Sequence, residues 1–491
     1  YNALRRNITI PASDINLTLV AYQINDNPAY TWLPPEGKEV EKNCASCHPV
    51  ITEMSLRDAH LNSARNPRFL TMYYGTDIHG NQSPPTRYVR GSAISAYVNM
   101  LVPLQPDLSK PYYGPGYRLD FPDTTGDCSS CHIPGASLRG NIDPASAKGA
   151  DKYGVHCDFC HKIANVCIRE KTLMPVPRVQ GSAAAEIRRP FPDDSKRSHL
   201  FFGTFEDVNA DEGDINLPLL KESRYCASCH FGVFWNTVIY NSYGEWLASP
   251  YSKAESGKAK TCQECHMPSP TVWKGKTITN VAPGKGGIER DPSTIHSHFM
   301  TVDETLLKNS LTMTVKTKVQ KQKIAVDVTL CNDKTGHHIP TDSPIRHLIL
   351  LVAAKDSRGN ALALIEGPTL PEWCGTGDPA KGYYAGLPGK TYAKLLIELW
   401  SKVFPTGAYW NHTEIVSDNR LAAFAKDVSS YSFIKPASGN TEVTVTLLYR
   451  RAFKNIVDWK KWDTPDIVMA QKKVMLRAAP NKSLSKLVSG N

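Results

Sequence analysis

Cys157-Asp-Phe-Cys160-His161 is one of five copies of a single pattern in this chain, and the pattern decides the fold. Each copy has two cysteines separated by two residues and a histidine directly after the second cysteine. The other four copies are Cys44-Ala-Ser-Cys47-His48, Cys128-Ser-Ser-Cys131-His132, Cys226-Ala-Ser-Cys229-His230 and Cys262-Gln-Glu-Cys265-His266. At ordinary cysteine and histidine frequencies, the chance of even one copy in a chain of this length is on the order of 1%. Five copies are therefore not accidental.

The C-x-x-C-H pattern is typical of covalent haem attachment. Two thiols about one helical turn apart can add to the two vinyl groups of one haem, and the adjacent histidine then lies under the iron as its proximal axial ligand. The sequence therefore predicts five c-type haems as cofactors. The expected attachment residues are Cys44, Cys47, Cys128, Cys131, Cys157, Cys160, Cys226, Cys229, Cys262 and Cys265, and the expected proximal ligands are His48, His132, His161, His230 and His266.

Three other uses of paired cysteines explain the pattern less well. A zinc ribbon also contains C-x-x-C pairs, but it does not need a histidine after every second cysteine. Thioredoxin-like redox motifs do not recur five times with a histidine, and a disulfide framework does not repeat this spacing. Haem attachment is the interpretation that accounts for all five copies.

The size and charge of the chain limit the classes of protein it can belong to. The 491 residues, 41% of them apolar, predict more than one domain and a sizeable core. The formal net charge of +10 is a balance often found in nucleic-acid-binding proteins. The propionates of five haems would offset it with roughly ten negative charges. We therefore interpret the basic residues as propionate partners and expect no nucleic-acid binding.

The apolar runs are short. The longest, such as Leu348 to Ala354, fall far below the roughly 20 residues that a membrane-spanning helix needs, so no membrane span is expected. The chain opens at Tyr1 rather than at a methionine, from which we expect a processed, mature form.

All five motifs lie between Cys44 and His266, in a half of the chain that is rich in proline, glycine, tyrosine and asparagine. This composition predicts a multihaem cytochrome fold, in which loops and short helices wrap around the haems. We assign residues 41–305 to this haem domain. Residues 1–40 precede it as an extended segment, in which apolar residues alternate between Ile8 and Leu19.

After residue 306 the pattern changes to period two. Apolar and polar residues alternate over 324–330 and 443–447, and the apolar run 347–353 ends at a turn signal. This alternation predicts a haem-free, C-terminal β-sandwich-like domain over residues 306–452. Residues 453–491 are expected to form a basic tail, with a short helix near Pro465–Arg477.

Three cysteines, Cys167, Cys331 and Cys374, lie outside the motifs. An odd number in an oxidising compartment suggests one disulfide and one free thiol. Cys331 and Cys374 are the expected pair, because both lie in the predicted β domain. The alternative is that all three are buried thiols.

A six-coordinate haem also needs a second axial ligand. The chain holds 15 histidines, and those outside the motifs are a surplus, since histidine is normally about 2% of residues. Met54 and Met267, which closely follow motif histidines, are the alternative ligands. Bis-histidine ligation generally gives lower potentials than ligation by histidine and methionine.

Several stretches around the motifs carry a family resemblance. They are Tyr225-Cys-Ala-Ser-Cys-His230, Tyr243-Gly-Glu-Trp-Leu-Ala-Ser-Pro250, Thr261-Cys-Gln-Glu-Cys-His-Met-Pro268 and Gly154-Val-His-Cys-Asp-Phe-Cys-His161. With them the chain resembles the secreted multihaem c-type cytochromes of metal- and sulfur-respiring microbes. The later Gly336-His-His-Ile-Pro-Thr341, Arg346 and Ser417-Asp-Asn-Arg420 resemble the β-rich C-terminal domain that some of them carry. The resemblance covers roughly residues 40–450.

This resemblance implies a set of distal histidines. His60 matches an H-x-x-S context in that family, His298 and His199 match a histidine that precedes phenylalanine, and His337 matches the Gly-His-x-x-Pro-Thr pattern. His156, next to Cys157, is expected to bind the iron of a neighbouring haem. The expected distal ligands are His60, His156, His199, His298 and His337, with His79 in reserve.

The expected function is electron transfer without a substrate, because an iron with two protein ligands has no position left for one. The resemblance implies an extracellular or periplasmic location, with redox proteins or extracellular acceptors as partners. It also implies a homo-oligomer or homopolymer, since some relatives form conductive filaments. The alternative is an enzyme similar to the pentahaem nitrite reductases, which share this size and haem count. Those enzymes usually have lysine in one motif and a helical C-terminal region, and this sequence has neither feature.

Overall fold

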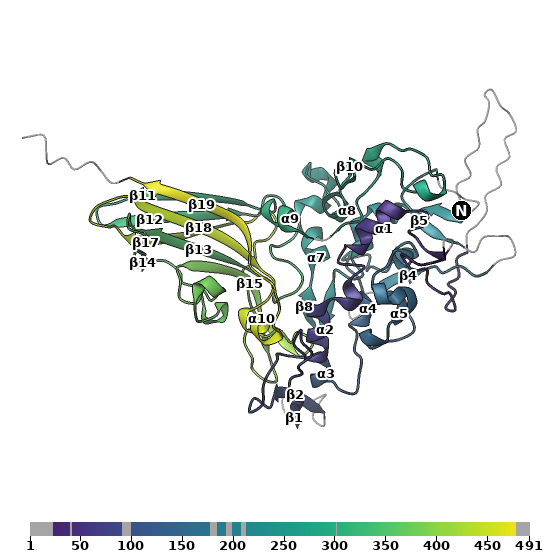
Figure 1. Ribbon diagram of the computed structural model, residues 1–491, viewed down its shortest axis with the longest axis horizontal. Coiled ribbons are helices and arrows are strands. Elements are labelled where there is room, and N and C mark those ends of the chain that lie inside the picture. The colour runs from purple at the N-terminus through teal and green to yellow at the C-terminus, as the bar shows by residue number, and fades with distance from the viewer. Residues whose placement is uncertain are drawn as a thin grey trace, which may run out of the picture. The chain divides into compact units, whose positions relative to one another are not determined.

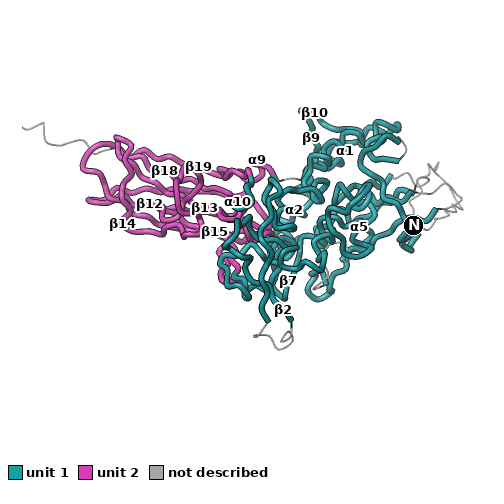
Figure 2. Tube along the Cα trace, turned by 60° about the horizontal axis from the view of Figure 1, so that its bottom comes forward, with its two compact units in different colours: residues 1–302, 397–414, 459–462 teal, residues 303–396, 415–458, 463–491 magenta. Residues whose placement is uncertain are grey.

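The structure is a computed structural model that describes residues 23–39, 42–90, 100–176, 184–192, 199–207, 213–300 and 302–477. The alternating stretch between Ile8 and Leu19 lies outside these residues. The chain divides into two compact units (Figure 2). Unit 1 comprises residues 1–302, 397–414 and 459–462, and unit 2 comprises residues 303–396, 415–458 and 463–491.

Unit 1 is built from short helices and two-stranded sheets, joined by long irregular segments (Figure 1). Its helices are α1 (Pro49–Leu56), α2 (Pro67–Tyr74), α3 (Tyr117–Asp120), α4 (Ser129–His132), α5 (Pro134–Ser137), α6 (Cys157–Cys160), α7 (Ser242–Leu247) and α8 (Cys262–His266). Its strands are β1 (Thr86–Arg90), β2 (Leu101–Pro106), β3 (Ile163–Val166), β4 (Ala185–Ile187), β5 (Phe201–Gly203), β6 (Asp214–Asn216), β7 (Gly232–Phe234), β8 (Thr237–Tyr240), β9 (Val272–Trp273) and β10 (Lys276–Thr277). The expected short helices and loops are confirmed.

Local sequence signals keep these helices short. Helix α2 begins with Pro67 after Asn66, whose side chain caps the first backbone N–H groups, and it ends at Gly75 in the left-handed conformation. Helix α8 begins with a capping box, in which Thr261 and Glu264 each bind the other's backbone N–H. Each helix therefore supplies only one or two turns, which is enough to present a five-residue motif.

The first described residues are part of the unit 1 core. Trp32 is buried against Phe159 and His156, and the backbone N–H of Leu33 donates to the carboxylate of Asp158. The segment around Trp32 therefore packs against the third motif.

Unit 2 contains the strands of a β-sandwich. Sheet order is β11-β12-β17-β14 in one layer and β16-β15-β13-β18-β19 in the other. The strands are β11 (Thr312–Val319), β12 (Lys323–Cys331), β13 (His347–Lys355), β14 (Leu364–Glu366), β15 (Gly389–Glu398), β16 (Thr413–Asp418), β17 (Lys426–Ile434), β18 (Thr441–Arg450) and β19 (Ile467–Leu476). Helix α9 (Glu304–Lys308) precedes the sandwich, and α10 (Lys454–Lys460) follows β18. The strands predicted at 324–330, 347–353 and 443–447 are confirmed.

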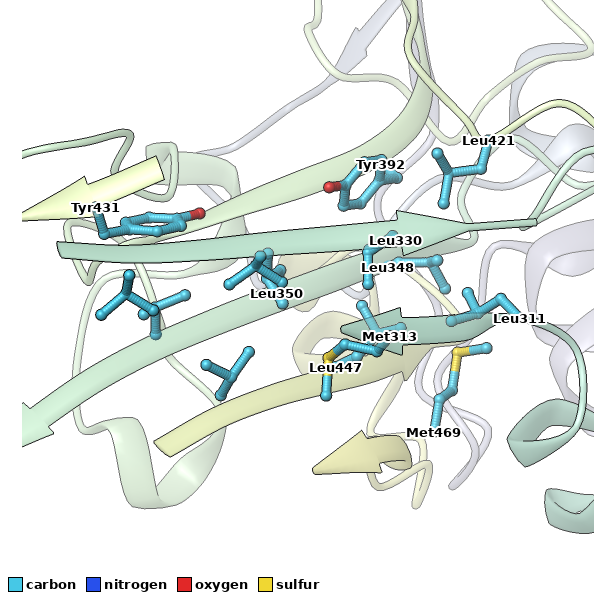
Figure 3. Close-up of a cluster of buried hydrophobic side chains, with 14 of the residues drawn as sticks. Leu311, Met313, Leu330, Leu348, Leu350, Tyr392, Leu421, Tyr431, Leu447 and Met469 are labelled. Atoms are coloured by element: carbon cyan, nitrogen blue, oxygen red, sulfur yellow. The ribbon is translucent and has the colours of Figure 1, made fainter. Parts of the chain in front are cut away.

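The core of the sandwich follows from strand alternation. On β12, Ile324, Val326 and Val328 point inward and are almost fully buried. On β13 and β18, Leu350 lies opposite Leu447, and both are fully buried. Figure 3 shows Leu350 and Leu447 within this cluster of buried side chains. Such period-two burial is what a two-layer β architecture requires.

One predicted element is wrong. Residues 465–477 were expected to contain a helix, but they form β19, which pairs antiparallel with β18 and places Val474 opposite Val443. Ile467 and Met469 are buried in the core while Val468 between them is exposed, which is strand alternation. The sandwich therefore extends past residue 452 to Leu476. Basic residues in the second half of β19 obscured this pattern in the sequence.

The expected Cys331–Cys374 disulfide is also wrong, because both cysteines are free. Cys331 follows the outward register of β12, while Cys374 packs with Ile349 and Leu448 against the outer face of the other sheet. Two packed sheets lie about 10 Å apart, and a disulfide needs Cα atoms within about 7 Å. Cys167 is free as well, and its thiol donates to Glu186 at 3.7 Å.

None of the helices in the described ranges is long and apolar enough to cross a membrane.

Candidate functional site

The five C-x-x-C-H motifs share one backbone shape. In four of them the histidine N–H donates to the carbonyl of the first cysteine, at 2.9 Å in the first and third motifs and 3.1 Å in the second and fourth. The fifth motif is itself helix α8. Each motif is therefore a single helical turn, with both thiols near one face and the imidazole directly after them. This is the arrangement that covalent attachment of one haem requires.

None of the ten motif cysteines takes part in a disulfide. Burial raises the pKa of Cys128 and of Cys160 to about 12, whereas the neighbouring Cys131 thiol lowers that of Cys229 to about 6. Within the described residues, no three ligating side chains converge as they would around a metal ion held by protein alone. The motif cysteines therefore fit a group that is held by two thiols at a time, as a haem is.

Thiols of different motifs lie against one another. The Cys44 thiol lies close to Cys157, Cys131 lies close to Cys229, and Cys226 lies close to Cys262. The Cys160 thiol also lies close to Cys229. The first motif therefore adjoins the third, and the fourth motif adjoins the second, third and fifth. Motifs up to about a hundred residues apart in sequence form one connected cluster.

Three of the motif histidines have a defined tautomer. The Nδ1 atoms of His48, His132 and His161 donate to the backbone carbonyls of Val281 (2.7 Å), Ser63 (3.2 Å) and Phe202 (2.6 Å) respectively. A carbonyl can only accept, so the proton resides on Nδ1 and the lone pair on Nε2. Metal-binding histidines typically have this second hydrogen bond.

Two predicted distal histidines face motif histidines. The ring centroids of His60 and His230 are 6.2 Å apart, and those of His161 and His298 are 6.5 Å apart. Two imidazoles on opposite sides of one metal, with metal–nitrogen bonds of about 2 Å, have ring centroids roughly 6.3 Å apart. Both pairs therefore have the separation of two axial ligands of one iron.

Both distal histidines of these pairs also have a tautomer suited to ligation. The Nδ1 of His298 donates to the carbonyl of His296 at 3.1 Å, and the Nδ1 of His60 donates to Asp58 at 2.8 Å. Burial, together with nearby His161, lowers the pKa of His298 to about 4, so this ring is neutral at pH 7. A neutral imidazole is the form that binds a metal.

His156 has a different environment. Its Nδ1 accepts the N–H of Phe159 at 3.2 Å as the N-cap of α6, which leaves the proton on Nε2. That Nε2 is fully buried and has no hydrogen-bond partner among the residues that the structure describes, and Asp151 is 3.7 Å away. This tautomer does not suit ligation through Nε2. The role of His156 as a distal ligand stays a prediction.

The remaining distal assignments also stay predictions. His199 lies just before β5 and stacks on Phe201, with centroids 5.9 Å apart. The Nδ1 of His337, in unit 2, donates to the carbonyl of His338 at 2.9 Å. His79 is exposed in the loop after α2.

Sequence reasoning passed over two residues of this site. The Nδ1 of His296 donates to the carbonyl of Met267 at 2.9 Å, directly after the fifth motif, which is the same tautomer as in the paired histidines. Asp58 accepts a hydrogen bond from His60 and is almost fully buried. The His-x-His spacing of His296 and His298 could have indicated the first, but no local pattern indicates the second.

Apolar and charged groups surround the motifs. The ring of Phe69 stacks on His132 with centroids 3.7 Å apart, and Tyr225 donates to the carbonyl of Cys160 at 2.7 Å. Around the third motif, Asp158 and Lys162 form a fully buried ion pair at 2.6 Å. Breaking such a pair by removing one partner typically costs about 3–5 kcal/mol. These contacts fix α6, and with it Cys157, Cys160 and His161.

No family model matches the chain, and no curated protein matches it. A solved structure of a penta-haem cytochrome c552 from Thermochromatium tepidum is similar, with a TM-score of 0.56 and 19% identity, over 88% of this chain and 97% of that one. A PapD-like domain of human CEP192 covers 37% of this chain and 90% of its own, but its TM-score of 0.15 is too low to indicate a shared fold. At the level of fold, this chain is similar to a penta-haem cytochrome.

Proposed function

We propose that this protein is a c-type cytochrome that holds five haems and transfers electrons between redox partners. The observation that carries the proposal is the set of five C-x-x-C-H motifs, each folded as one helical turn with neither cysteine in a disulfide. The similarity to the fold of a penta-haem cytochrome supports it.

The residues of each motif have separate roles. The two cysteines would hold a haem through thioether bonds, and the histidine would bind its iron through Nε2. When bound, the haem iron supplies one-electron exchange between its ferric and ferrous forms. The carbonyls of Val281, Ser63 and Phe202 hold the Nδ1 protons, so three of the imidazoles present a fixed lone pair.

Bis-histidine ligation favours electron transfer over catalysis. His60 with His230, and His161 with His298, have the spacing of paired axial ligands. An iron held on both sides by protein has no open position for a substrate. We propose the same type of ligation at the other three motifs, with distal ligands from among His156, His199, His337, His79 and His296.

The contacts between motif thiols support exchange among the five sites. The fourth motif lies against the second, third and fifth, and the third lies against the first. Because each motif lies close to at least one other motif, no site is isolated from the rest. We propose that electrons move within this connected cluster.

We further propose that the protein works outside the cytoplasm, with other redox proteins or extracellular acceptors as partners, and that it associates with copies of itself. These proposals rest on the sequence resemblance.

Mass spectrometry and carbon monoxide binding test the proposed function. The intact holoprotein should exceed the chain mass by five haem units, and the haem should survive acid–acetone extraction because it is covalently bound. Carbon monoxide added to the reduced protein should leave the Soret band unchanged, because all five irons already have two ligands. Four or fewer haems would contradict the attachment sites. A stoichiometric shift at one haem would favour a reductase with one open site.

A further inference from the structure

Asp58 is a buried carboxylate that the five motifs do not account for. It follows α1 and only 1% of its surface is exposed. Its Oδ1 accepts the backbone N–H of His60 at 2.9 Å and the Nδ1–H of the same residue at 2.8 Å. Its Oδ2 accepts the backbone N–H of Met300 at 2.7 Å. Three N–H groups therefore converge on one side chain.

The first consequence concerns His60. The carboxylate accepts the Nδ1 proton and leaves the lone pair on Nε2, in a ring whose centroid lies 6.2 Å from that of His230. A carboxylate partner also makes the imidazole a stronger electron donor than a carbonyl partner does. Stronger donation stabilises ferric iron over ferrous iron and so lowers the reduction potential.

The second consequence concerns His298. Met300 lies two residues after His298, whose ring faces His161. Asp58 therefore links the segment that presents His60 to the segment that presents His298. One side chain holds the distal residues of both paired sites at a set separation.

A purely structural role of Asp58 leaves one contact unexplained. Its two oxygens join the backbone N–H groups of His60 and Met300, which an asparagine, with one acceptor oxygen, could not do. A buried charge costs several kcal/mol unless its partners stabilise it. The further hydrogen bond that this carboxylate accepts from the Nδ1 of His60, a candidate iron ligand, is not needed to join the two segments.

We propose that Asp58 is a positioning residue that sets the tautomer and the electron donation of His60 toward the fourth haem. The inference rests on the proposed function, because it requires His60 and His230 to bind one iron. Asp58 itself does not touch the iron.

The test is a spectroelectrochemical titration of the Asp58→Asn holoprotein, with electron paramagnetic resonance of the oxidised form. The variant should keep five haems and low-spin irons. One haem should become easier to reduce by about tenfold in its equilibrium constant, which is about 59 mV for one electron. The low-spin g-values of that haem should also change, because its axial ligand has lost a negatively charged partner.

Asp120→Asn is the matched control. Asp120 is also a buried carboxylate in unit 1, but it accepts from Trp410, Asn411 and Thr86 rather than from a histidine. The Asp120→Asn variant should show no comparable shift in the reduction potential of any haem. If both variants shift one haem equally, removal of any buried charge explains the effect and the inference is overturned.

A second pair of variants covers the case in which Asp58→Asn yields no holoprotein. Asp58→Glu and Asp58→Gln have the same length and differ only in charge, so the charged variant should have the lower potential. Identical titrations of this pair, or of Asp58→Asn and the wild type, would overturn the inference while leaving the proposed function intact. A wild-type protein with a high-spin fourth haem would instead contradict the proposed function.

Discussion

Under the proposed function, single residues would decide which iron has a free position. His298 and His161 are both buried, and their ring centroids are 6.5 Å apart. The two residues come from segments more than a hundred positions apart, so their pairing depends on the fold. Each such pair would close one of the proposed haem sites to external ligands.

Substitution of His298 by leucine should open one site. The variant should retain five haems, because the attachment cysteines are unchanged, but carbon monoxide should now shift the Soret band with the amplitude of one haem. The control is His347→Leu, because His347 is equally buried but lies in unit 2 between Trp373 and Phe453. If carbon monoxide left the Soret band of the His298→Leu variant unchanged, another group would have to bind opposite His161.

Lys460 makes stability depend on pH. It is fully buried, donates to the carbonyls of Thr71 (2.9 Å) and Pro115 (2.6 Å), and burial lowers its pKa from 10.5 to about 7. Between pH 7 and 10.5 the folded state therefore binds fewer protons at this residue than the unfolded state does. The contribution of Lys460 to the free energy of unfolding should rise with pH across this window.

Denaturant unfolding of the wild type and of Lys460→Met at several pH values measures this dependence. The difference in free energy of unfolding between them should move in favour of the wild type as pH rises from 7 to 10. Lys461→Met, a substitution at the exposed neighbour, is the control and should show no such trend. A difference that is constant with pH would mean that Lys460 is charged in the folded protein.

At the scale of elements, the two units depend on different forces. The helices of unit 1 are too short to be stable alone, since isolated helices below about 12–15 residues are marginal in water. They are held by packing and by hydrogen bonds such as those of Asp58 and Asp158. The strands of unit 2 bury a continuous apolar core and form long ladders, as β13 does with β18.

A core substitution in unit 2 should destabilise that unit without changing the haem spectrum. Leu350→Ala removes a fully buried side chain between the two layers and should cost about 2–5 kcal/mol. Far-ultraviolet circular dichroism during urea unfolding should show an earlier transition, while the native Soret band stays unchanged. The control is Lys355→Ala, at the exposed end of β13. Its free energy of unfolding should lie within about 0.5 kcal/mol of the wild-type value. A native Soret band altered by Leu350→Ala would mean that unit 2 contributes to a haem environment.

At the scale of the whole molecule, self-association is the proposal that the resemblance adds. An alternating segment without a partner can complete the sheet of another copy, and the segment between Ile8 and Leu19 has this pattern. The test should remove residues 1–22 only, because Asn27, Tyr30 and Trp32 belong to the packed core of unit 1.

Light scattering at high protein concentration should find the full chain in an oligomer and the shortened chain in a smaller state. The shortened holoprotein should keep five haems and its native spectrum, which controls for misfolding. A monomeric full chain would contradict the proposal altogether. An unchanged assembly after deletion would contradict only the part assigned to the N-terminal segment.

The sequence by itself determined the features that depend on neighbouring residues. Cys157, Cys160 and His161 lie within one helical turn, so their spacing alone places two thiols and an imidazole together. Strand alternation at 324–330 and 443–447 is equally local, and it predicted the sandwich. Both signals depend on residues only a few positions apart, so they can be recognised in the sequence itself.

The tertiary structure decided the features that join distant residues. His60 faces His230, Asp58 binds both His60 and Met300, and Cys331 and Cys374 lie on opposite faces of the sandwich. Strand β19 formed where a helix was expected, because β18 offered a paired edge that overrides local preference. Such pairings arise only when packing brings distant segments together. The packing energy comes from contacts across the whole core, so no single stretch of sequence determines it.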